Sequence, residues 1–253
     1  MITITKPSKM IYPVHWVYFA DDPSALPVIR PWDIVVYKQA NEAVKEYLEN
    51  RAITVRKFYT LLTDLTQPVD VLWNALNSTR KHNIRQMSRE TDSQLEISVN
   101  QLPIAEFYAH YCTFSQQKGF GKPSYRALNI FVKHCDVIHI TYQGKCCAIR
   151  TVIRDLASRV RCIHYVNNFD PAISGQVRGR ISAYLIWWEM QHYKAKGLET
   201  YDWGGIITDP SSPAYGITEF KESFGGKRHQ DWDVVLAGDM LKPLSNMILR
   251  HFS

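Results

Sequence analysis

The run of predicted strands in the middle of this chain constrains the fold more than any other feature. Three segments alternate apolar and polar residues and are separated by short polar turns: DVIHITY, CCAIRTVIR and SRVRCIHYVNNF, at 136–142, 146–154 and 158–169. This alternation predicts an antiparallel meander whose sheet is half covered by helices. A long helix that ends at Gly197 and a further strand, LETYDW, follow the meander.

Predicted elements on both sides of the meander extend the same arrangement. Upstream, the pattern predicts a strand at 56–65, a helix that starts near Pro68 and runs through about residue 90, a helix between Pro103 and Gly119, and a short helix at 125–134. Downstream, it predicts a helix in YGITEFKESFGG and a last strand, DWDVVLAG. The fold class is therefore α+β, with a central, mostly antiparallel twisted sheet and helices on both faces. We expect residues 1–55 to be an irregular extension or the remnant of a first domain, before a main domain at 56–253.

Composition narrows the class of partner and the compartment. The 253 residues carry a formal charge of +6 and a pI near 9.0, which suits phosphate-rich partners such as tRNA, nucleotides or coenzymes. The N-terminus has no signal-peptide pattern and no apolar run approaches the roughly 18 residues of a membrane span, so we expect a cytoplasmic protein. Five cysteines without CxxC spacing and nine histidines without ligand spacing argue against a disulfide framework or a metal site.

A lysine lies on the apolar side of the helix predicted in YGITEFKESFGG. At helical spacing, Ile217, Phe220, Lys221 and Phe224 share one stripe. A lysine with a buried stem can hold a poorly solvated positive charge beside a reacting carbonyl, where such a donor stabilises an oxyanion. Two structural interpretations stay open: a lysine whose ammonium reaches solvent, or one paired with a buried carboxylate such as Asp202.

The segment YDWGGI combines a carboxylate with paired glycines at the end of a predicted strand. Asp202 is a candidate to accept the proton of an amine or to orient it, and Asp209 and Glu219 are weaker candidates for the base. Equally, Asp202 can cap backbone amides in a turn. The glycines allow a ligand to approach closely, so an acceptor-binding set is predicted from Trp203, Gly204, Gly205 and Tyr215.

Two basic segments are candidates for phosphate binding. In STRKHNIRQMSRE, Lys81, Arg85 and Arg89 recur at i, i+4 and i+8, with Arg80 beside the core positions of the same helix. A solvated helix face explains the same stripe. In SGQVRGRI, between a strand and the long helix, the predicted donor-binding residues are Gln176, Arg178, Gly179 and Arg180. That segment can also be a plain strand-to-helix turn.

Three of these segments, in this order, resemble a known family. LLTDLTQPVDVLWNALNSTRKHNIRQM, LIWWEMQHYKAKGLETYDWGGI and YGITEFKESFGG look like the second half of the Fem family, the aminoacyl-tRNA-dependent peptidyltransferases, and like single-domain relatives in the GNAT acyltransferase superfamily. The similarity covers about 57–236 and implies a GNAT-like fold, with Lys221 near the reaction centre. Residues 1–55 are too short for the family's first domain. Where typical GNAT enzymes have Q/R-x-x-G-x-G/A, Gln176 and Gly179 match but Ile181 replaces the last small residue, which weakens a coenzyme A donor more than a tRNA donor.

Together, these features predict an amide-forming transferase without a tightly bound cofactor. A neutral amine attacks an activated carbonyl, Lys221 stabilises the oxyanion, and Asp202 positions or deprotonates the amine. The favoured donor is aminoacyl-tRNA, and an acyl-CoA or an acyl-carrier protein is the alternative. The acceptor is an amine on an amino sugar, nucleoside, peptide or cell-envelope precursor. A catalytically degenerate GNAT domain that binds RNA or a nucleotide is the alternative of another class.

Overall fold

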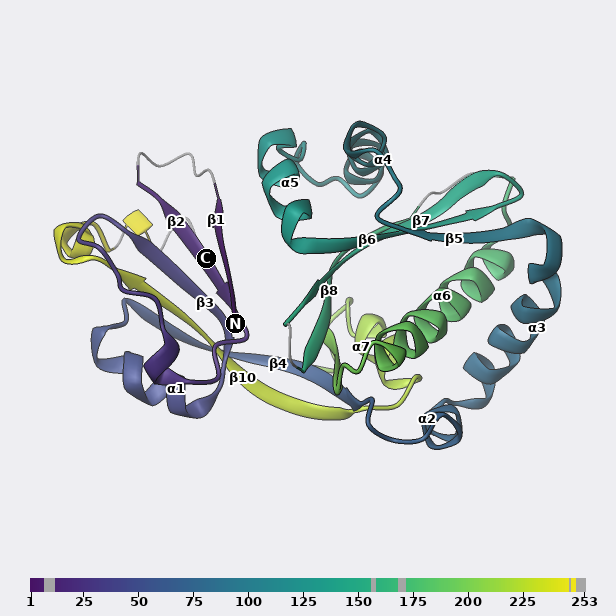
Figure 1. Ribbon diagram of the computed structural model, residues 1–253, viewed down its shortest axis with the longest axis horizontal. Coiled ribbons are helices and arrows are strands. Elements are labelled where there is room, and N and C mark those ends of the chain that lie inside the picture. Colours follow the sequence, from purple (N-terminus) through teal and green to yellow (C-terminus); the bar gives the residue numbers. More distant parts are fainter. Residues whose placement is uncertain (7–11, 156–157, 168–171, 246, 249–253) are drawn as a thin grey trace. The chain divides into compact units, whose positions relative to one another are not determined.

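The computed structural model describes residues 1–6, 12–155, 158–167, 172–245 and 247–248 (Figure 1). The chain forms two compact units: Met1–Thr60 with His229–Ser253, and Leu61–Arg228. Two long strands, β4 (Thr54–Asp64) and β10 (Lys227–Ala237), contribute to both. Strands pair in the order β1-β2-β3-β10-β4-β9-β8-β7-β6-β5, which makes one mixed, mostly antiparallel ten-stranded sheet.

The first unit contains regular structure where the sequence predicted an irregular region at 1–55. β1 (Ile2–Lys6) pairs antiparallel with β2 (Val14–Tyr18), β2 pairs parallel with β3 (Ile34–Ala40), and β3 pairs antiparallel with β10. Helix α1 (Glu42–Leu48) and the short 3-10 helices Pro23–Ala25, Glu49–Arg51 and Asp239–Leu244 complete the unit. The irregular extension was the wrong alternative, because β3 is buried on both faces and its apolar run lacks the alternation of a half-buried strand. The other alternative, a remnant of a first domain, stays a prediction.

The predicted meander forms the sheet of the second unit. β5 (Leu95–Val99), β6 (Cys135–Tyr142), β7 (Lys145–Arg154) and β8 (Arg159–Asn167) pair antiparallel in this order. β9 (Thr200–Gly205) pairs parallel with the start of β8, where Arg159–Arg161 face Thr200–Asp202. β8 continues six residues beyond this pairing.

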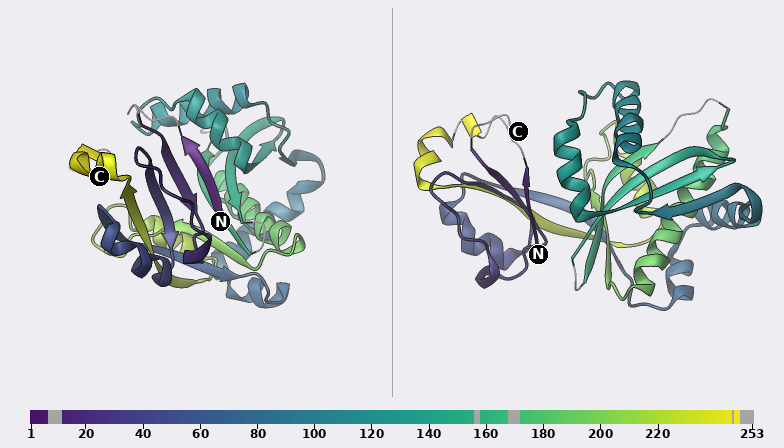
Figure 2. Two further views of the ribbon diagram at one scale, coloured as in Figure 1. Left: turned by 60° about the vertical axis from the view of Figure 1, so that its left-hand side comes forward. Right: turned by 45° about the horizontal axis from the view of Figure 1, so that its top comes forward.

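Helices cover both faces of this sheet (Figures 1 and 2). One core contains residues of α2 (Val69–Ala75), α3 (Ser78–Gln94) and α6 (Gly175–Ala195), and α7 (Gly216–Glu222) packs Phe220 against it. The core of the other face contains residues of α4 (Ile104–Gln117) and α5 (Tyr125–Phe131), which continues into the 3-10 helix Val132–His134. The predicted α+β class, with helices on both faces, is confirmed.

Two helix boundaries differ from the predictions. The helix expected from Pro68 to about residue 90 is interrupted, because Leu76 is extended and the Asn77 side chain caps α3 by accepting a hydrogen bond from Arg80 N at 2.9 Å. Helix α6 begins at Gly175, capped by Ser174, so SGQVRGRI is the start of the helix and not a turn before it. Among the described helices, none is long and apolar enough to cross a membrane.

Candidate functional site

Helix α7 holds Lys221 at the end of strand β9. The half-buried side chain directs Nζ to the carbonyl oxygens of Gly205 and Gly204, at 2.6 and 3.4 Å. The pKa of Lys221 is lowered to about 8, mainly by burial; the positive charges of Arg161 and Arg150 also lower it, whereas Cys162 and Asp202 raise it. Near physiological pH, this lysine therefore has a larger neutral fraction than a solvated lysine.

The apolar stripe predicted for α7 is only partly correct. Phe224 is fully buried, and Phe220 is half-buried and packs against the core. Ile217, by contrast, is 54% exposed, and Thr218 takes the buried position instead. The Thr218 hydroxyl accepts a hydrogen bond from the backbone nitrogen of Ile207 at 2.8 Å and donates one to the Ile207 carbonyl at 3.0 Å. Tying the loop to the helix in this way requires a hydroxyl on the inner face.

Arg80 of α3 braces α7. Its guanidinium lies over the rings of Phe220 and Phe224, 4.5 and 5.3 Å from their centroids, and its Nε donates to the Ser223 hydroxyl at 2.7 Å. Burial lowers the pKa of Arg80. The backbone nitrogen of Asn77 also donates to the Ser223 carbonyl at 2.9 Å. Through these contacts, the Arg80 side chain supports α7, the helix that carries Lys221.

The other predicted basic residues of α3 have different surroundings. Lys81 donates to the Asn74 carbonyl at 3.1 Å, and the exposed Arg85 lies over the ring of Trp73 at 5.3 Å. The exposed Arg89 completes the stripe. Arg80 thus faces α7, whereas Lys81, Arg85 and Arg89 lie on the outward-facing side of α3.

Both oxygens of the Asp202 carboxylate have partners. Oδ2 lies 2.9 Å from Nη2 of Arg159, whose Nε also donates to it at 3.1 Å, and Oδ1 accepts from the Gly204 backbone nitrogen at 2.8 Å. The side chain is fully buried. Gly204 has φ +70°, a conformation that favours glycine. The geometry therefore matches the capping turn considered from the sequence, and Asp202 shapes the carbonyls that Lys221 contacts.

The predicted acceptor residues do not share one environment. Trp203 is a core residue, 6% exposed, whose indole nitrogen donates to the Thr63 hydroxyl at 2.9 Å, so its burial does not favour contact with an acceptor. Gly205 is exposed beside Lys221. Tyr215 precedes α7, and its hydroxyl accepts a hydrogen bond from Arg228 at 3.2 Å. The weaker base candidates, Asp209 and Glu219, are exposed.

The start of α6 lines a cavity of about 160 Å³. Gln176 is exposed and Arg180 half-buried, whereas Arg178 and Gly179 line the cavity together with Ile181. The remaining lining residues are Cys147, Ala148, Asn167, Ser182 and Phe220. Phe220 immediately precedes Lys221, so the structure brings two predicted donor-binding residues to the helix that carries the predicted catalytic lysine.

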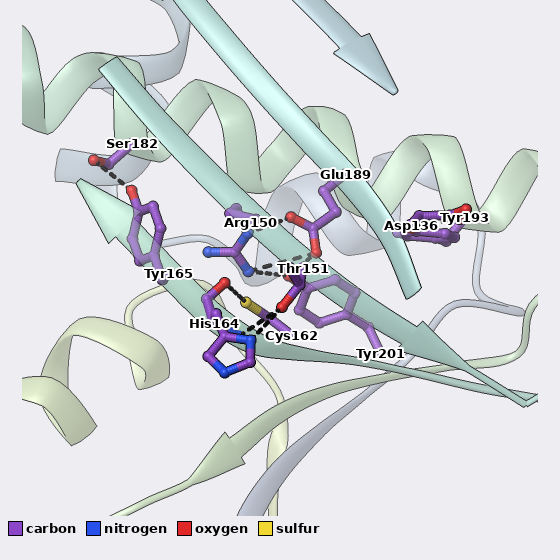
Figure 3. A network of polar contacts seen from close by, with 10 residues as sticks. All are labelled: Asp136, Arg150, Thr151, Cys162, His164, Tyr165, Ser182, Glu189, Tyr193 and Tyr201. Carbon is purple, nitrogen blue, oxygen red and sulfur yellow. Dashed lines mark hydrogen bonds and ion pairs between the residues drawn. The ribbon is translucent and has the colours of Figure 1, made fainter. Parts of the chain in front are cut away.

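A buried ion pair near this cavity was missed from the sequence (Figure 3). Nε of Arg150 lies 2.5 Å from Oε2 of Glu189, and the Tyr201 hydroxyl accepts from Arg150 at 3.0 Å and donates to Glu189 at 2.9 Å. The Arg150 guanidinium lies 4.6 Å from the centroid of Tyr165, which donates to Ser182 at 2.8 Å. The available signal was a charged residue among mainly apolar neighbours in each of two segments: Arg150 in CCAIRTVIR and Glu189 in LIWWEM.

Within the described ranges, no three His, Cys, Asp or Glu side chains converge as a metal site would require. The sequence matches no protein-family model and no curated protein.

Solved structures share the fold. One is FemX, 9% identical with a TM-score of 0.62, aligned over 96% of this chain and 85% of that one. Another is the C-terminal DUF2156 domain of a candidate lysylphosphatidylglycerol synthetase from Agrobacterium fabrum, 13% identical with a TM-score of 0.59, over 97% and 85%. A third is L-PGS from Bacillus licheniformis, 10% identical with a TM-score of 0.53, over 86% and 72%. These likenesses confirm the GNAT-like, FemAB-like fold that the sequence resemblance implied.

Proposed function

We propose that this protein is an amide-forming transferase that moves an aminoacyl group from aminoacyl-tRNA to an amine acceptor. The observation that carries the proposal is Lys221, a half-buried ammonium with a pKa near 8 that donates to the Gly204 and Gly205 carbonyls and follows Phe220 of the cavity wall. The shared fold of FemX and the L-PGS proteins supports it.

In the proposed reaction, the nitrogen of a neutral amine attacks the carbonyl carbon of the donor ester. The new C–N bond converts the carbonyl into a tetrahedral oxyanion, which the Lys221 ammonium stabilises; one preorganised donor of this kind contributes about 3–4 kcal/mol. Collapse of the intermediate breaks the C–O bond to the donor ribose. The nitrogen loses a proton, and the departing ribose oxygen gains one, so the step is balanced without an oxidant or a metal.

Asp202 acts in this proposal as a positioning residue. Its carboxylate holds the turn at Gly204, and the carbonyls of Gly204 and Gly205 hold the Lys221 ammonium. In this proposal, the acceptor enters past Gly205 and Tyr215, and the same turn orients its amine. Donor phosphates would contact cationic side chains of two helices, Lys81 and Arg85 on α3 and Arg178 and Arg180 on α6, together with the neutral amide of Gln176.

One observation favours an acyl-CoA or acyl-carrier-protein donor as the second candidate. The first turns of α6 carry Gln176, Arg178 and Gly179, and a helix N-terminus with basic side chains suits the phosphates of coenzyme A. The candidate of another class is a degenerate GNAT domain that binds RNA or a nucleotide without catalysis.

The test offers the purified protein a panel of charged tRNAs and acyl-CoA thioesters with a panel of amines, and detects amides by mass spectrometry. RNase treatment before the assay abolishes product if the donor is tRNA and leaves it intact if the donor is a thioester. Binding of a donor without product from any combination would support the binding module and overturn the transferase. Lys122→Ala, at an exposed loop position, serves as the matched control for variants of Lys221.

A further inference from the structure

The cavity at the start of α6 has walls of mainly hydrocarbon character. Ala148 and Ile181 are 2% exposed, and the Phe220 ring closes one side. The Cys147 thiol donates to the Lys145 carbonyl, and the Ser182 hydroxyl accepts from Tyr165 (Figure 3). Polar character concentrates on two lining residues, Arg178 and Asn167. A guest of this cavity therefore needs a compact apolar group joined to a polar remainder.

The volume limits the size of that apolar group. An apolar cavity of about 150 Å³ accommodates benzene or xenon, and the volume here is about 160 Å³. A branched side chain of about three to six carbon atoms is of this size, whereas an indole or a long fatty chain exceeds it.

We propose that this cavity selects the transferred group by binding its apolar side chain. The inference rests on the proposed transfer reaction, and names its substrate class: an aminoacyl or short acyl group with a compact hydrocarbon side chain. Phe220 lines the cavity and Lys221 follows it on α7, so one short helix presents both the specificity wall and the oxyanion donor. The Arg150–Glu189 pair holds Tyr165, and through it Ser182, against the cavity wall.

Gly179 offers a way to fill the cavity without a clash. It lines the cavity, and a Cβ added there meets no atom within 4 Å. Leucine also has a higher helix propensity than glycine, so Gly179→Leu should fold as well as the wild type. Gly175→Leu is the matched control, because Gly175 lies in the first turn of the same helix, is also free of neighbours within 4 Å, and is exposed.

The first arm of the test compares donors of increasing side-chain size, from glycyl through valyl and leucyl to tryptophanyl, or from acetyl through isovaleryl to decanoyl. We expect the wild type to prefer the middle of the series by roughly tenfold or more in kcat/KM, since one methylene in an apolar pocket changes selectivity about 10-fold to 200-fold. Gly179→Leu should remove this preference, so that kcat/KM for the leucyl or isovaleryl donor falls relative to that for the glycyl or acetyl donor, and Gly175→Leu should keep the wild-type order. A flat wild-type profile, or an equal loss for every donor in Gly179→Leu, would overturn the inference.

The second arm needs no turnover. Crystals pressurised with xenon should show xenon between Phe220 and Ile181 in the wild type and none there in Gly179→Leu. An empty cavity in the wild type under xenon overturns the inference even where transfer is observed. If no donor yields an amide, the proposed function fails, and the xenon result alone then decides whether the cavity takes an apolar group.

Discussion

Two cations in the Leu61–Arg228 unit are removed from bulk water in different ways. Arg150 lies in the sheet, 4% exposed, with Glu189 and Tyr201 as partners. Lys221 is half-buried and donates to the neutral carbonyls of Gly204 and Gly205. A cationic side chain next to a carboxylate stays protonated when it is buried. For a cationic side chain whose hydrogen-bond partners are neutral carbonyls, burial destabilises the charged form, and the pKa falls. The comparison separates a charge that is paired within the fold from one that the proposed reaction uses.

The largest effect is expected from removing the partner of Arg150. Glu189→Ala leaves a buried guanidinium without its carboxylate, which should cost about 3–5 kcal/mol of unfolding free energy. Urea denaturation followed by circular dichroism measures this loss. The double variant Arg150→Met/Glu189→Leu should recover most of the stability, because apolar replacement of both charges removes the desolvation penalty. If the double variant did not recover stability, the ion pair would contribute to the free energy of unfolding beyond the mutual compensation of its two buried charges.

Lys221→Ala should have the opposite profile, with a large effect on turnover and a small one on stability. Losing an oxyanion donor should lower kcat/KM on the order of a hundredfold, while the half-buried side chain leaves little packing to lose. The amide assay and urea denaturation of the same preparation provide both numbers. Activity within about twofold of the wild type would contradict the oxyanion role, and Lys122→Ala should leave both measurements unchanged.

The comparison also predicts a pH dependence. If the protonated lysine stabilises the oxyanion, activity should fall as pH rises through about 8, by roughly tenfold one unit above that pKa. Folding stability should move the other way. Because the folded-state pKa lies below the value of about 10.4 for a solvated lysine, the unfolded state binds more protons between these values, and stability rises with pH there.

Lys221→Arg tests whether the titration of Lys221 causes both pH effects. An arginine stays protonated through this range, so both the fall in activity and the rise in stability should shift out of the window. Rate profiles and urea midpoints between pH 7 and 10 test this prediction. An unchanged fall in activity in Lys221→Arg would assign the titration to another group.

The sequence predicted local features well and partners across the chain poorly. The meander and the helix between Pro103 and Gly119 were correct, because alternation, proline and glycine act over neighbouring residues. Lys221 could be proposed as a site residue because a lysine broke a local apolar pattern. The partner of Asp202 was not found, since Arg159 meets it only where β8 and β9 pair in parallel, 43 residues apart. Parallel register depends on tertiary packing, which single-sequence periodicity does not contain.

The tertiary partners of Arg80 were likewise not visible in the sequence. Substituting this residue should have the smallest of the predicted effects. The sequence grouped this residue with the phosphate-binding stripe, whereas its contacts are with α7, from a position 143 residues away from Ser223. Arg80→Lys keeps the charge but loses the Nε donor and the planar stacking. If Arg80 supports Lys221, kcat should fall about fivefold, which corresponds to about 1 kcal/mol, with the KM for the donor unchanged. If Arg80 binds donor phosphate, the KM and its salt dependence should change instead, and Arg85→Lys, on the exposed face of the same helix, provides the matched comparison.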